Sequence, residues 1–248
     1  MTYYLNNSNK KKNFQETSWN EWLAGLIDAN GCLLISPKGY TSLEITMGIS
    51  DELALLQIKK LLGGSVKLRS GARAVRYRLH HKEGMEILLS KINGYCRNSI
   101  RVLQLQKLCV KMQLDYIFPV ELTIESGWFA GFFDGDGTIG YSFKKDRPQL
   151  IISVSNKKQI DCLPFKEKFG GFVRLDRRCN VYKWDLYEKN QILFFCNYLK
   201  KYPLYSHKKN RLFLVSEFYE LTSLSLYKQP KNTLMYKTWQ KFEQKWFS

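Results

Sequence analysis

Long hydrophobic runs are missing from this chain of 248 residues. Its apolar stretches, such as WLAGLI at 22–27, are far shorter than the roughly 18 residues that cross a bilayer. The N-terminal MTYYLNNSNKKKNF has neither the apolar core of a signal peptide nor the arginine content of a transit peptide. We therefore expect a soluble protein with no membrane partner.

Histidine and paired cysteines are also scarce. The chain has 3 histidines, and its 6 cysteines include no CxxC pair, which argues against a structural zinc site. Without a secretory signal, free thiols in a reducing compartment are a better interpretation than a disulfide framework. With 6 prolines, 16 glycines and 44% hydrophobic residues, the composition excludes a disordered or collagen-like chain.

Acidic side chains are outnumbered, with 22 Asp and Glu against 39 Lys and Arg and a net charge of +17. Residues 1–124 hold 17 basic and 10 acidic side chains, and residues 125–248 hold 22 and 12. Such a surplus favours DNA, RNA or an acidic membrane surface as partner. Because both halves carry it, we expect both to touch the same polyanion.

An internal repeat divides the chain. WLAGLIDANGCLLIS at 22–36 recurs as WFAGFFDGDGTIGYS at 128–142 with six of fifteen positions identical, where chance gives roughly one. The register continues 107 residues apart: LEITMGIS at 43–50 matches LIISVSNK at 150–157, and Ser99-Ile100-Arg101 matches Ser206-His207-Lys208. The sequence therefore predicts two similar halves, with residues 112–127 as their connection.

Each half is predicted to run helix, hairpin, helix, hairpin, helix. In the first half, a Lys38-Gly39 turn precedes a strand whose Leu43, Ile45, Met47 and Ile49 share one face. Ser50 is the expected cap of the next helix, Gly63 its end, and Ser70-Gly71 the second hairpin turn.

Apolar and basic side chains alternate along the second strand of the second hairpin. Val75, Tyr77 and Leu79 face one way, whereas Arg76, Arg78 and His80 face the other. In the second half, Tyr182, Trp184 and Leu186 alternate with Lys183 and Asp185. A solvated sheet face remains the alternative, but cations this one-sided favour a polyanion-binding face. Two such antiparallel sheets would form a saddle suited to a DNA duplex.

The repeated segments carry a family resemblance. LAGLIDANG at 23–31 and FAGFFDGDG at 129–137 resemble the two signature motifs of the single-chain LAGLIDADG homing endonucleases. The resemblance extends from about Ser18 to the C-terminal helices. It implies that the motif helices pack together, that the sheets lie in the DNA major groove, and that acids at the motif ends bind divalent metals.

Ala24, Gly25, Ala130 and Gly131 are small, so the backbones of the two motif helices can pack closely. Close packing would place the C-terminal ends of the two helices next to each other. A carboxylate there lies at the negative end of a helix dipole and calls for a cation. The resemblance implies a metal site made of Asp136, Asn30 and the carbonyls of Ala29 and Gly135. Its oxygen donors suit Mg²⁺, with Ca²⁺ or Mn²⁺ as substitutes. Asp28 and Asp134, two residues earlier, are interpreted as structural.

The first motif departs from the family at Asn30, which stands where the second motif has Asp136. A carboxamide offers a metal one oxygen but no charge, and it is no base. We therefore expect weaker metal binding and suppressed cutting of at least one strand. Natural decay of activity, adaptation to a non-cleaving role and deliberate substitution all remain open.

Basic residues complete the predicted catalytic set. The resemblance implies a lysine or arginine near the scissile phosphate in each half, and Lys208 and Arg101 match those places. Their expected role is to stabilise charge in the transition state and to organise water. Solvated helix-start residues are the alternative interpretation.

Residues on the hairpins that face away from the apolar stripe are the candidates for base readout. In the first half these are Leu34, Ser36, Lys38, Glu44, Thr46, Lys67, Arg69, Arg76, Arg78 and His80. In the second half they are Gly140, Ser142, Lys144, Gln149, Ile151, Ser153, Arg174, Asp176, Lys183 and Asp185. Arg and Lys suit guanine, Gln suits adenine, and Glu or Asp suits cytosine. Because the two sets differ, the target is predicted to be an imperfect palindrome.

The sequence thus predicts an α+β monomer with two pseudo-symmetric αββαββα subdomains, residues 1–124 and 125–248, each with a curved antiparallel DNA-binding sheet. The predicted function is a Mg²⁺-dependent, sequence-specific double-strand DNA endonuclease, impaired by Asn30. The alternative is a non-cleaving nucleic-acid binder, either an intron RNA maturase or an inactive DNA-binding relative. The resemblance implies an intron-encoded protein of the mitochondrion or plastid.

Overall fold

Two similar halves make up the chain. The computed structural model describes the backbone of residues 2–248 and the side chains of residues 13–248. Residues 112–127 contain neither helix nor strand and join the halves, as predicted. The first half consists of α1 (Thr2–Asn30), β1 (Gly31–Ile35), β2 (Thr41–Gly48), α2 (Glu52–Leu62), β3 (Ser65–Leu68), β4 (Ala74–Leu79), α3 (Lys82–Ile92) and α4 (Ser99–Lys111).

The second half repeats this order and extends it. It consists of α5 (Trp128–Asp136), β5 (Gly137–Lys144), β6 (Arg147–Asn156), α6 (Leu163–Phe169), β7 (Phe172–Asp176), β8 (Val181–Leu186), α7 (Lys189–Lys201), α8 (Lys208–Ser223) and α9 (Leu234–Phe247). Short 3₁₀ turns at Ile49–Asp51 and Gln159–Asp161 precede α2 and α6, and a third lies at Leu226–Lys228. The α+β class is confirmed.

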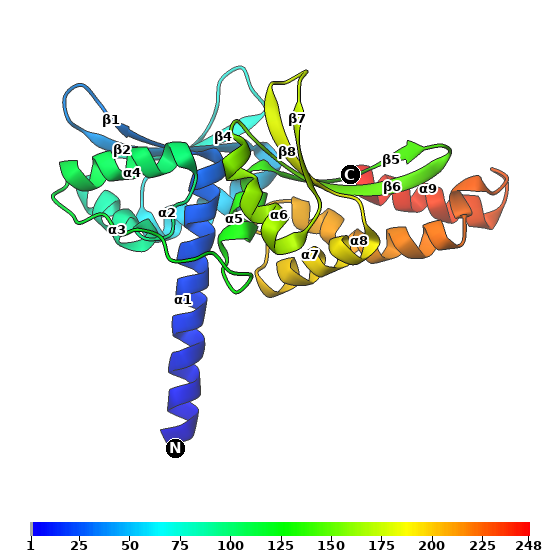
Figure 1. Cartoon of the computed structure of the whole chain (residues 1–248), viewed down its shortest axis with the longest axis horizontal. Helices are drawn as coiled ribbons and strands as arrows, with labels where there is room; N and C mark the ends of the chain where they lie inside the picture. Colours follow the sequence, from blue (N-terminus) through cyan, green and yellow to red (C-terminus); the bar gives the residue numbers. More distant parts are fainter. Residues whose placement is uncertain (1) are drawn as a thin grey trace.

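Each half has one four-stranded antiparallel sheet with the same topology. The strand orders are β1-β2-β4-β3 and β5-β6-β8-β7, so the internal repeat is confirmed at the level of the fold. The strands lie along one side of the molecule with most of the helices beneath them, and α1 projects away from the body (Figure 1). The strands therefore lie on the side of the molecule opposite the projecting end of α1 (Figure 1).

The motif helices α1 and α5 are in close backbone contact. A Cβ added to Gly25 would collide with the carbonyl oxygen of Trp128, and one added to Gly131 would collide with that of Trp22. The two glycines thus allow an approach that a larger side chain would block. The close packing predicted from the small residues of both motifs is confirmed.

Alternation along the strands separates core from surface. Val75, Tyr77 and Leu79 are fully buried, and Arg78 is exposed on the opposite face. Leu43, Ile45 and Met47 are buried as predicted, but Ile49 is 45% exposed. The prediction was wrong for Ile49 because the strand ends at Gly48 and the chain turns into a 3₁₀ helix.

Two further local predictions need correction. The first half has one helix more than the αββαββα order and the second half has two. In each half the last segment breaks in two, at Asn93 between α3 and α4 and at Tyr202 between α7 and α8, and the second half ends with the additional helix α9. Asn98 caps α4 by accepting the backbone N–H groups of Ile100 and Arg101. Ser50 does not cap α2; its hydroxyl lies 3.1 Å from Nδ1 of His207 in the other half.

The helix ends and turns fall at the predicted glycines. Gly39, Gly63 and Gly71 all have positive φ, where a Cβ would be strained. The cysteines are free thiols, four of them buried, although Cys179 is exposed. Within residues 2–248, none of the helices is both long and apolar enough to span a membrane.

Candidate active site and nucleic-acid interface

The C-terminal ends of α1 and α5 touch each other. A Cβ added to Gly135 would lie 3.3 Å from Cγ of Asn30, next to the side chain of Ala29. Each motif helix ends at the matching residue, Asn30 in α1 and Asp136 in α5, and a strand follows at once. The structure therefore brings together the four residues predicted to form the metal site: Ala29, Asn30, Gly135 and Asp136.

Asp136 opens into a cleft of about 430 Å³ between the halves. Arg101 lines the same cleft, as do Ile100 and Ala29. Burial raises the pKa of the Asp136 carboxyl to about 7, although the charges of Lys208 and Arg101 act to lower it. The side chain is thus a desolvated acid for which a bound cation would be stabilising.

Lys208 caps the C-terminus of α5. Its Nζ donates to the carbonyl oxygens of Phe133 at 3.0 Å, Asp134 at 2.6 Å and Gly135 at 2.9 Å. Phe133 also accepts the backbone N–H of Gly137. The last carbonyls of a helix generally lack partners within it, and a cation at this end also complements the helix dipole. Burial lowers the pKa of Lys208, while the charges of Asp134, Asp51 and Asp136 oppose that shift. The interpretation of Lys208 as a solvated helix-start residue is therefore wrong.

Arg101 occupies the equivalent place in the first half. Its Nε donates to the carbonyl oxygen of Ile27 at 3.3 Å, and Ile27 matches Phe133 in the repeat. Its Nη1 lies 3.3 Å from Oε1 of Gln104. Each motif helix thus ends against a cation from its own half, and the charges of both cations act on Asp136.

Asp28 and Asp134 hold the two halves together, as their predicted structural role requires. The indole Nε1 of Trp128 donates to Asp28 at 2.8 Å, and that of Trp22 donates to Asp134 at 2.8 Å. Asp28 also accepts the backbone N–H of Arg97 at 2.6 Å. Both carboxylates are 1% exposed, although Asp28 also lines the cleft beside Asp136.

A second exchange of hydrogen bonds links each half to the start of α4 or α8 in the other half. Asp51 of the first half accepts the backbone N–H of His207 at 2.7 Å, at the start of α8. Asp161 of the second half accepts the backbone N–H of Ser99 at 2.8 Å, at the start of α4. Carboxylates at helix N-termini are stabilising. These contacts fix the helices that carry Lys208 and Arg101.

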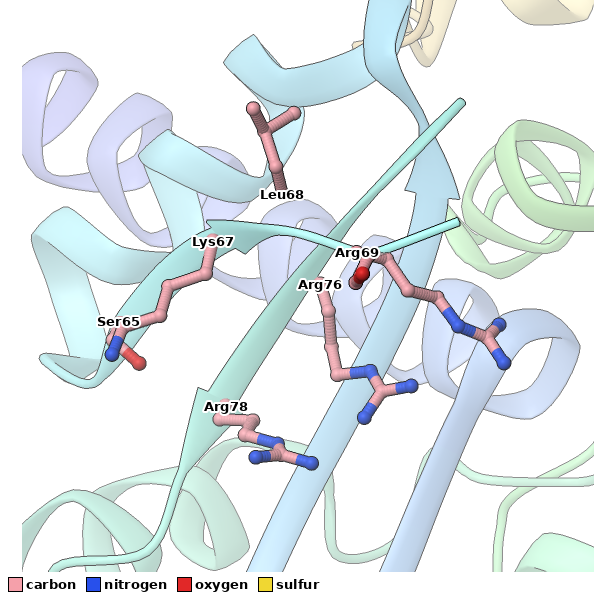
Figure 2. Close-up of a pocket in the computed structure, with 7 residues that line it drawn as sticks. Ser65, Lys67, Leu68, Arg69, Arg76 and Arg78 are labelled. Atoms are coloured by element: carbon pink, nitrogen blue, oxygen red, sulfur yellow. The ribbon is translucent and has the colours of Figure 1, made fainter. Parts of the chain in front are cut away.

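The first sheet has a basic outer face. Arg76 and Arg78 extend from β4 to the same side as Arg69, above an open pocket of about 370 Å³ (Figure 2). Lys67 lies opposite Arg76 in the β3–β4 register. Glu44 of β2 pairs with both arginines, 2.7 Å from Nε of Arg78 and 3.4 Å from Nη1 of Arg76.

The second sheet carries its charges in tighter pairs. Asp185 is 0% exposed and lies 2.6 Å from Nε of Arg174. Asp176 is 5% exposed and lies 2.9 Å from Nζ of Lys183. Both acids were predicted to read cytosine. In this structure their oxygens are already engaged by neighbouring cations.

The remaining candidates for base readout lie on the same two outer faces. Cross-strand pairs place Gln149 opposite Ser142, Ile151 opposite Gly140, and Thr46 opposite Arg76. Ser153 donates to the buried Asp185 from the neighbouring strand. The rest lie on the outer sides or tips of the hairpins, namely Leu34, Ser36, Lys38, His80 and Lys144. Their contacts with DNA stay predictions.

Four polar residues that line the cleft beside Asp136 were not predicted from the sequence: Asn98, Ser155, Asn156 and Lys157. Three of them lie at the C-terminal end of β6, where Ser155 and Asn156 close the strand and Lys157 follows it, and this polar run SNK interrupts the alternation. That run aligns with GIS in the first half, and its added polarity was the available signal. Asn98 is brought in only by the folding of α4 against α1.

The donor set at the helix ends fits a divalent cation only in part. Asp136 supplies the one carboxylate, and Asn30, Ala29 and Gly135 supply neutral oxygens. Within residues 13–248, no three His, Cys, Asp or Glu side chains are grouped closely enough to hold a metal by themselves. Mg²⁺ is often bound by one or two carboxylates together with substrate phosphates, so this set is suited to a metal that arrives with a phosphate.

The fold and site define a class of protein: single chains with two pseudo-symmetric α+β halves, whose paired helices end between two antiparallel sheets. The chain belongs to the LAGLIDADG endonuclease family, whose model matches residues 23–111 and 129–219. The resemblance inferred from the two motifs is thereby confirmed. Endonucleases of this family generally depend on a divalent metal.

Its relatives are intron-encoded proteins. The chain is 47% identical to an intron-encoded RNA maturase, bI4, of Saccharomyces cerevisiae over 92% of its length. It is 42% identical to a probable intron-encoded endonuclease, aI2, of Debaryomyces hansenii over 97% of its length. It spans 36% and 39% of those two yeast proteins. An intron-encoded DNA endonuclease of Dictyostelium discoideum, ai2a, is 31% identical, with 96% of this chain and 79% of that protein covered.

Solved structures share the fold at low sequence identity. The meganuclease I-AabMI bound to uncleaved DNA matches with a TM-score of 0.69 and 16% identity, over 92% of this chain and 98% of that one. The homing endonuclease I-GzeII in complex with its DNA target matches with a TM-score of 0.65 and 16% identity, over 90% and 96%. The single-chain LAGLIDADG fold is therefore shown.

Proposed function

We propose that this chain binds a long, pseudo-palindromic double-stranded DNA site and hydrolyses phosphodiesters in it, with cleavage weakened by Asn30. The observation that carries the proposal is the position of Asp136, which shares one cleft with Arg101 at the meeting point of the two halves. Basic sheet faces lie on both sides of this point. The endonuclease relatives of D. hansenii and D. discoideum support the same activity.

A divalent metal, Mg²⁺ or in its place Ca²⁺ or Mn²⁺, would be held by Asp136, by the carboxamide oxygen of Asn30 and by the carbonyls of Ala29 and Gly135. Such an ion activates water and stabilises the leaving oxygen of a phosphodiester. Gly135 already accepts a hydrogen bond from Lys208, but a carbonyl oxygen has a second lone pair to offer. Asn30 leaves the first half-site one negative charge short.

The basic residues act on the phosphate itself. Lys208 and Arg101 are fixed against the ends of α5 and α1 by backbone carbonyls, so their charges are already oriented before DNA binds. Fixed charges need little reorganisation when negative charge develops on the phosphate oxygens. We assign to both residues the stabilisation of that charge, one for each strand.

The protein is proposed to act as a monomer in an organelle. Residues 1–124 and 125–248 act as the two halves of one monomeric DNA-binding unit, each contacting one half of the target. The yeast relatives are intron-encoded, and by analogy this chain acts in the mitochondrion, or in a plastid.

A second function is favoured by a specific pair of observations. Asn30 removes a carboxylate from the metal site, and the 47% identical yeast relative is an RNA maturase. Both agree with a protein that assists splicing of intron RNA and does not cut DNA. Its basic sheets would then bind structured RNA in place of a duplex.

A direct comparison of the two nucleic acids tests these functions. The purified chain would be offered randomised DNA duplexes and, separately, the folded RNA of its own intron, and binding and nicking in Mg²⁺ would be measured. We expect selection of a specific duplex and slow, Mg²⁺-dependent nicking of one strand. Tight binding to the intron RNA with no duplex selected would overturn the endonuclease in favour of the maturase.

A further inference from the structure

Two arginines, one on the outer face of each sheet, are held by a carboxylate in the same way. In the first half, Nε of Arg78 lies 2.7 Å from Oε1 of Glu44. In the second half, Nε of Arg174 lies 2.6 Å from Oδ2 of Asp185. The arginine side chains are 54% and 48% exposed, whereas the carboxylates are 27% and 1% exposed. The acids thus lie beneath the guanidinium groups.

Binding through Nε has a geometric consequence. Nε is the guanidinium nitrogen nearest the aliphatic stem, so a carboxylate there fixes the plane of the group and leaves the two terminal nitrogens at its outer end. Paired donors in one plane are what O6 and N7 of guanine accept in the major groove. Fixing the side chain beforehand also lowers the conformational entropy lost on binding.

We propose, on the basis of the proposed DNA binding, that Arg78 and Arg174 each read a guanine, and that Glu44 and Asp185 are positioning residues that do not contact bases. This assignment replaces the expectation that the two acids read cytosine. A carboxylate that already accepts an arginine N–H and is covered by it is poorly placed to accept the amino group of a base.

Arg76 provides a contrast within the same strand. Its contact with Glu44 is through a terminal nitrogen, Nη1, at 3.4 Å, and its side chain is only 26% exposed. Its Nε is buried and, within the described residues, has no hydrogen-bond partner. Its guanidinium is neither fixed through Nε nor as exposed as those of Arg78 and Arg174. It therefore contributes positive charge and affinity but no base preference.

The two guanine readers occupy different places in the repeat. At the offset of 107 residues, Arg78 on β4 corresponds to Asp185 on β8, and Arg174 on β7 corresponds to Lys67 on β3. Arg78 is on an inner strand of its sheet and Arg174 on an edge strand. The guanines that they read therefore lie at positions unrelated by the pseudo-two-fold axis, and the target departs from a palindrome at both.

Selection from randomised duplex DNA, without Mg²⁺ so that the DNA stays intact, tests the assignment. The base preference at each position would be compared between the unmodified chain and single variants, with thermal unfolding recorded for each. We expect Arg78→Ala to lose its preference for guanine at one position, a discrimination of about 5- to 150-fold, and to leave the others intact. Arg76→Ala should weaken binding to all duplexes alike.

Variants of the acids separate positioning from base contact. Glu44→Ala should relax the same position as Arg78→Ala, whereas Glu44→Gln, whose carboxamide oxygen still accepts Nε–H, should retain the preference. At one position of the other half-site, Arg174→Ala should relax the preference, whereas Asp185→Asn, whose carboxamide oxygen still accepts Nε–H, should retain it. If Asp185→Asn does not fold, Arg174→Lys, which keeps the charge but not the paired donors, makes the same distinction.

Three outcomes would count against the assignment. If Glu44→Ala relaxed a cytosine position that Arg78→Ala leaves intact, Glu44 would be a base reader and the assignment would be wrong. If both arginine variants kept the full base preference, neither arginine would read guanine. If the unmodified chain enriched no duplex at all, the proposed DNA binding itself would be wrong. This outcome differs from a failure of the guanine assignment alone, in which the unmodified chain still selects a duplex.

Discussion

Trp22 and Asp134 belong to different halves of the chain and share a buried hydrogen bond of 2.8 Å between indole Nε1 and Oδ2. Trp128 and Asp28 repeat this bond in the opposite direction, also at 2.8 Å. The pair of bonds crosses the packed helices α1 and α5 on both sides. The first acid of each motif, Asp28 or Asp134, therefore joins the halves, and the terminal residue two positions later is left for chemistry.

Removing one indole donor should weaken the contact between halves. Trp22→Phe keeps the aromatic ring but leaves an oxygen of Asp134 without that partner. Because that oxygen still accepts the backbone N–H of Tyr205, we expect the free energy of unfolding to fall by about 1.5–3 kcal/mol, the contribution of one hydrogen bond to a charged group. Urea denaturation measures it, with Trp19→Phe on the same helix as the control. Equal stability of the two variants would contradict the structural role of this bond.

The backbone contact at Gly25 should tolerate no side chain. Gly25→Ala places a methyl group against the carbonyl of Trp128, and we expect a loss of about 3 kcal/mol, the upper end for overpacking. Gly140→Ala is the matched control, because its Cβ would meet only the side chain of Ile151 at 4.0 Å. Thermal unfolding of both variants checks this prediction, and an unaltered midpoint for Gly25→Ala would mean that the helices can separate freely.

Much of this interface followed from the sequence. Small residues in both motifs predicted the close helix contact, and the position of Asp28 and Asp134 before the motif ends predicted their structural role. Strand alternation also identified the buried face of β4. These features depend on local periodicity or on the repeat, and both are visible in the order of residues along the chain.

Contacts between distant segments could not be predicted in this way. Ser50 looked like a helix cap, but its neighbour Asp51 accepts the backbone N–H of His207, 156 residues away. Asp185 had the alternation of an outward-facing residue, yet Arg174 of the adjacent strand covers it. The place of Lys208 against three carbonyls of α5 likewise depends on how α8 packs, which local sequence does not encode.

The ion pair of Asp176 and Lys183 should make the free energy of unfolding depend on pH. The hydrogen bond from Lys183 is the main reason that the pKa of Asp176 is lowered to about 2. A carboxyl whose pKa is lower in the folded state stabilises the protein above its usual pKa, and that contribution is lost as pH falls toward 2.

We therefore expect Asp176→Asn to be less stable than the unmodified chain at pH 6, with the difference shrinking between about pH 4 and pH 2. Urea denaturation across this range measures the difference. Asp146→Asn, in the turn between β5 and β6, is the control and should show no such trend. A difference that is constant with pH would contradict the ion pair.

Lys208 should matter more to the rate of cleavage than to binding. In a chain that also carries Asn30→Asp, Lys208→Met removes a fixed charge, and we expect slower cleavage of one strand with a much smaller loss of DNA affinity. Single-turnover cleavage with each strand labelled separately resolves the effect, and Lys209→Met controls for charge alone. Equal slowing of both strands would indicate action at a shared metal, and no slowing would remove Lys208 from the catalytic site.

A strand-resolved time course of DNA cleavage in Mg²⁺ decides whether Asn30 limits the chemistry. Asn30→Asp restores a second carboxylate beside Asp136, at a point where both halves meet. We expect double-strand cleavage of the selected duplex to be faster by about tenfold or more, at least 1.4 kcal/mol of barrier, with nearly unchanged affinity. If the variant cut no faster than the unmodified chain while still binding the duplex, Asn30 would not be the cause of weak cleavage.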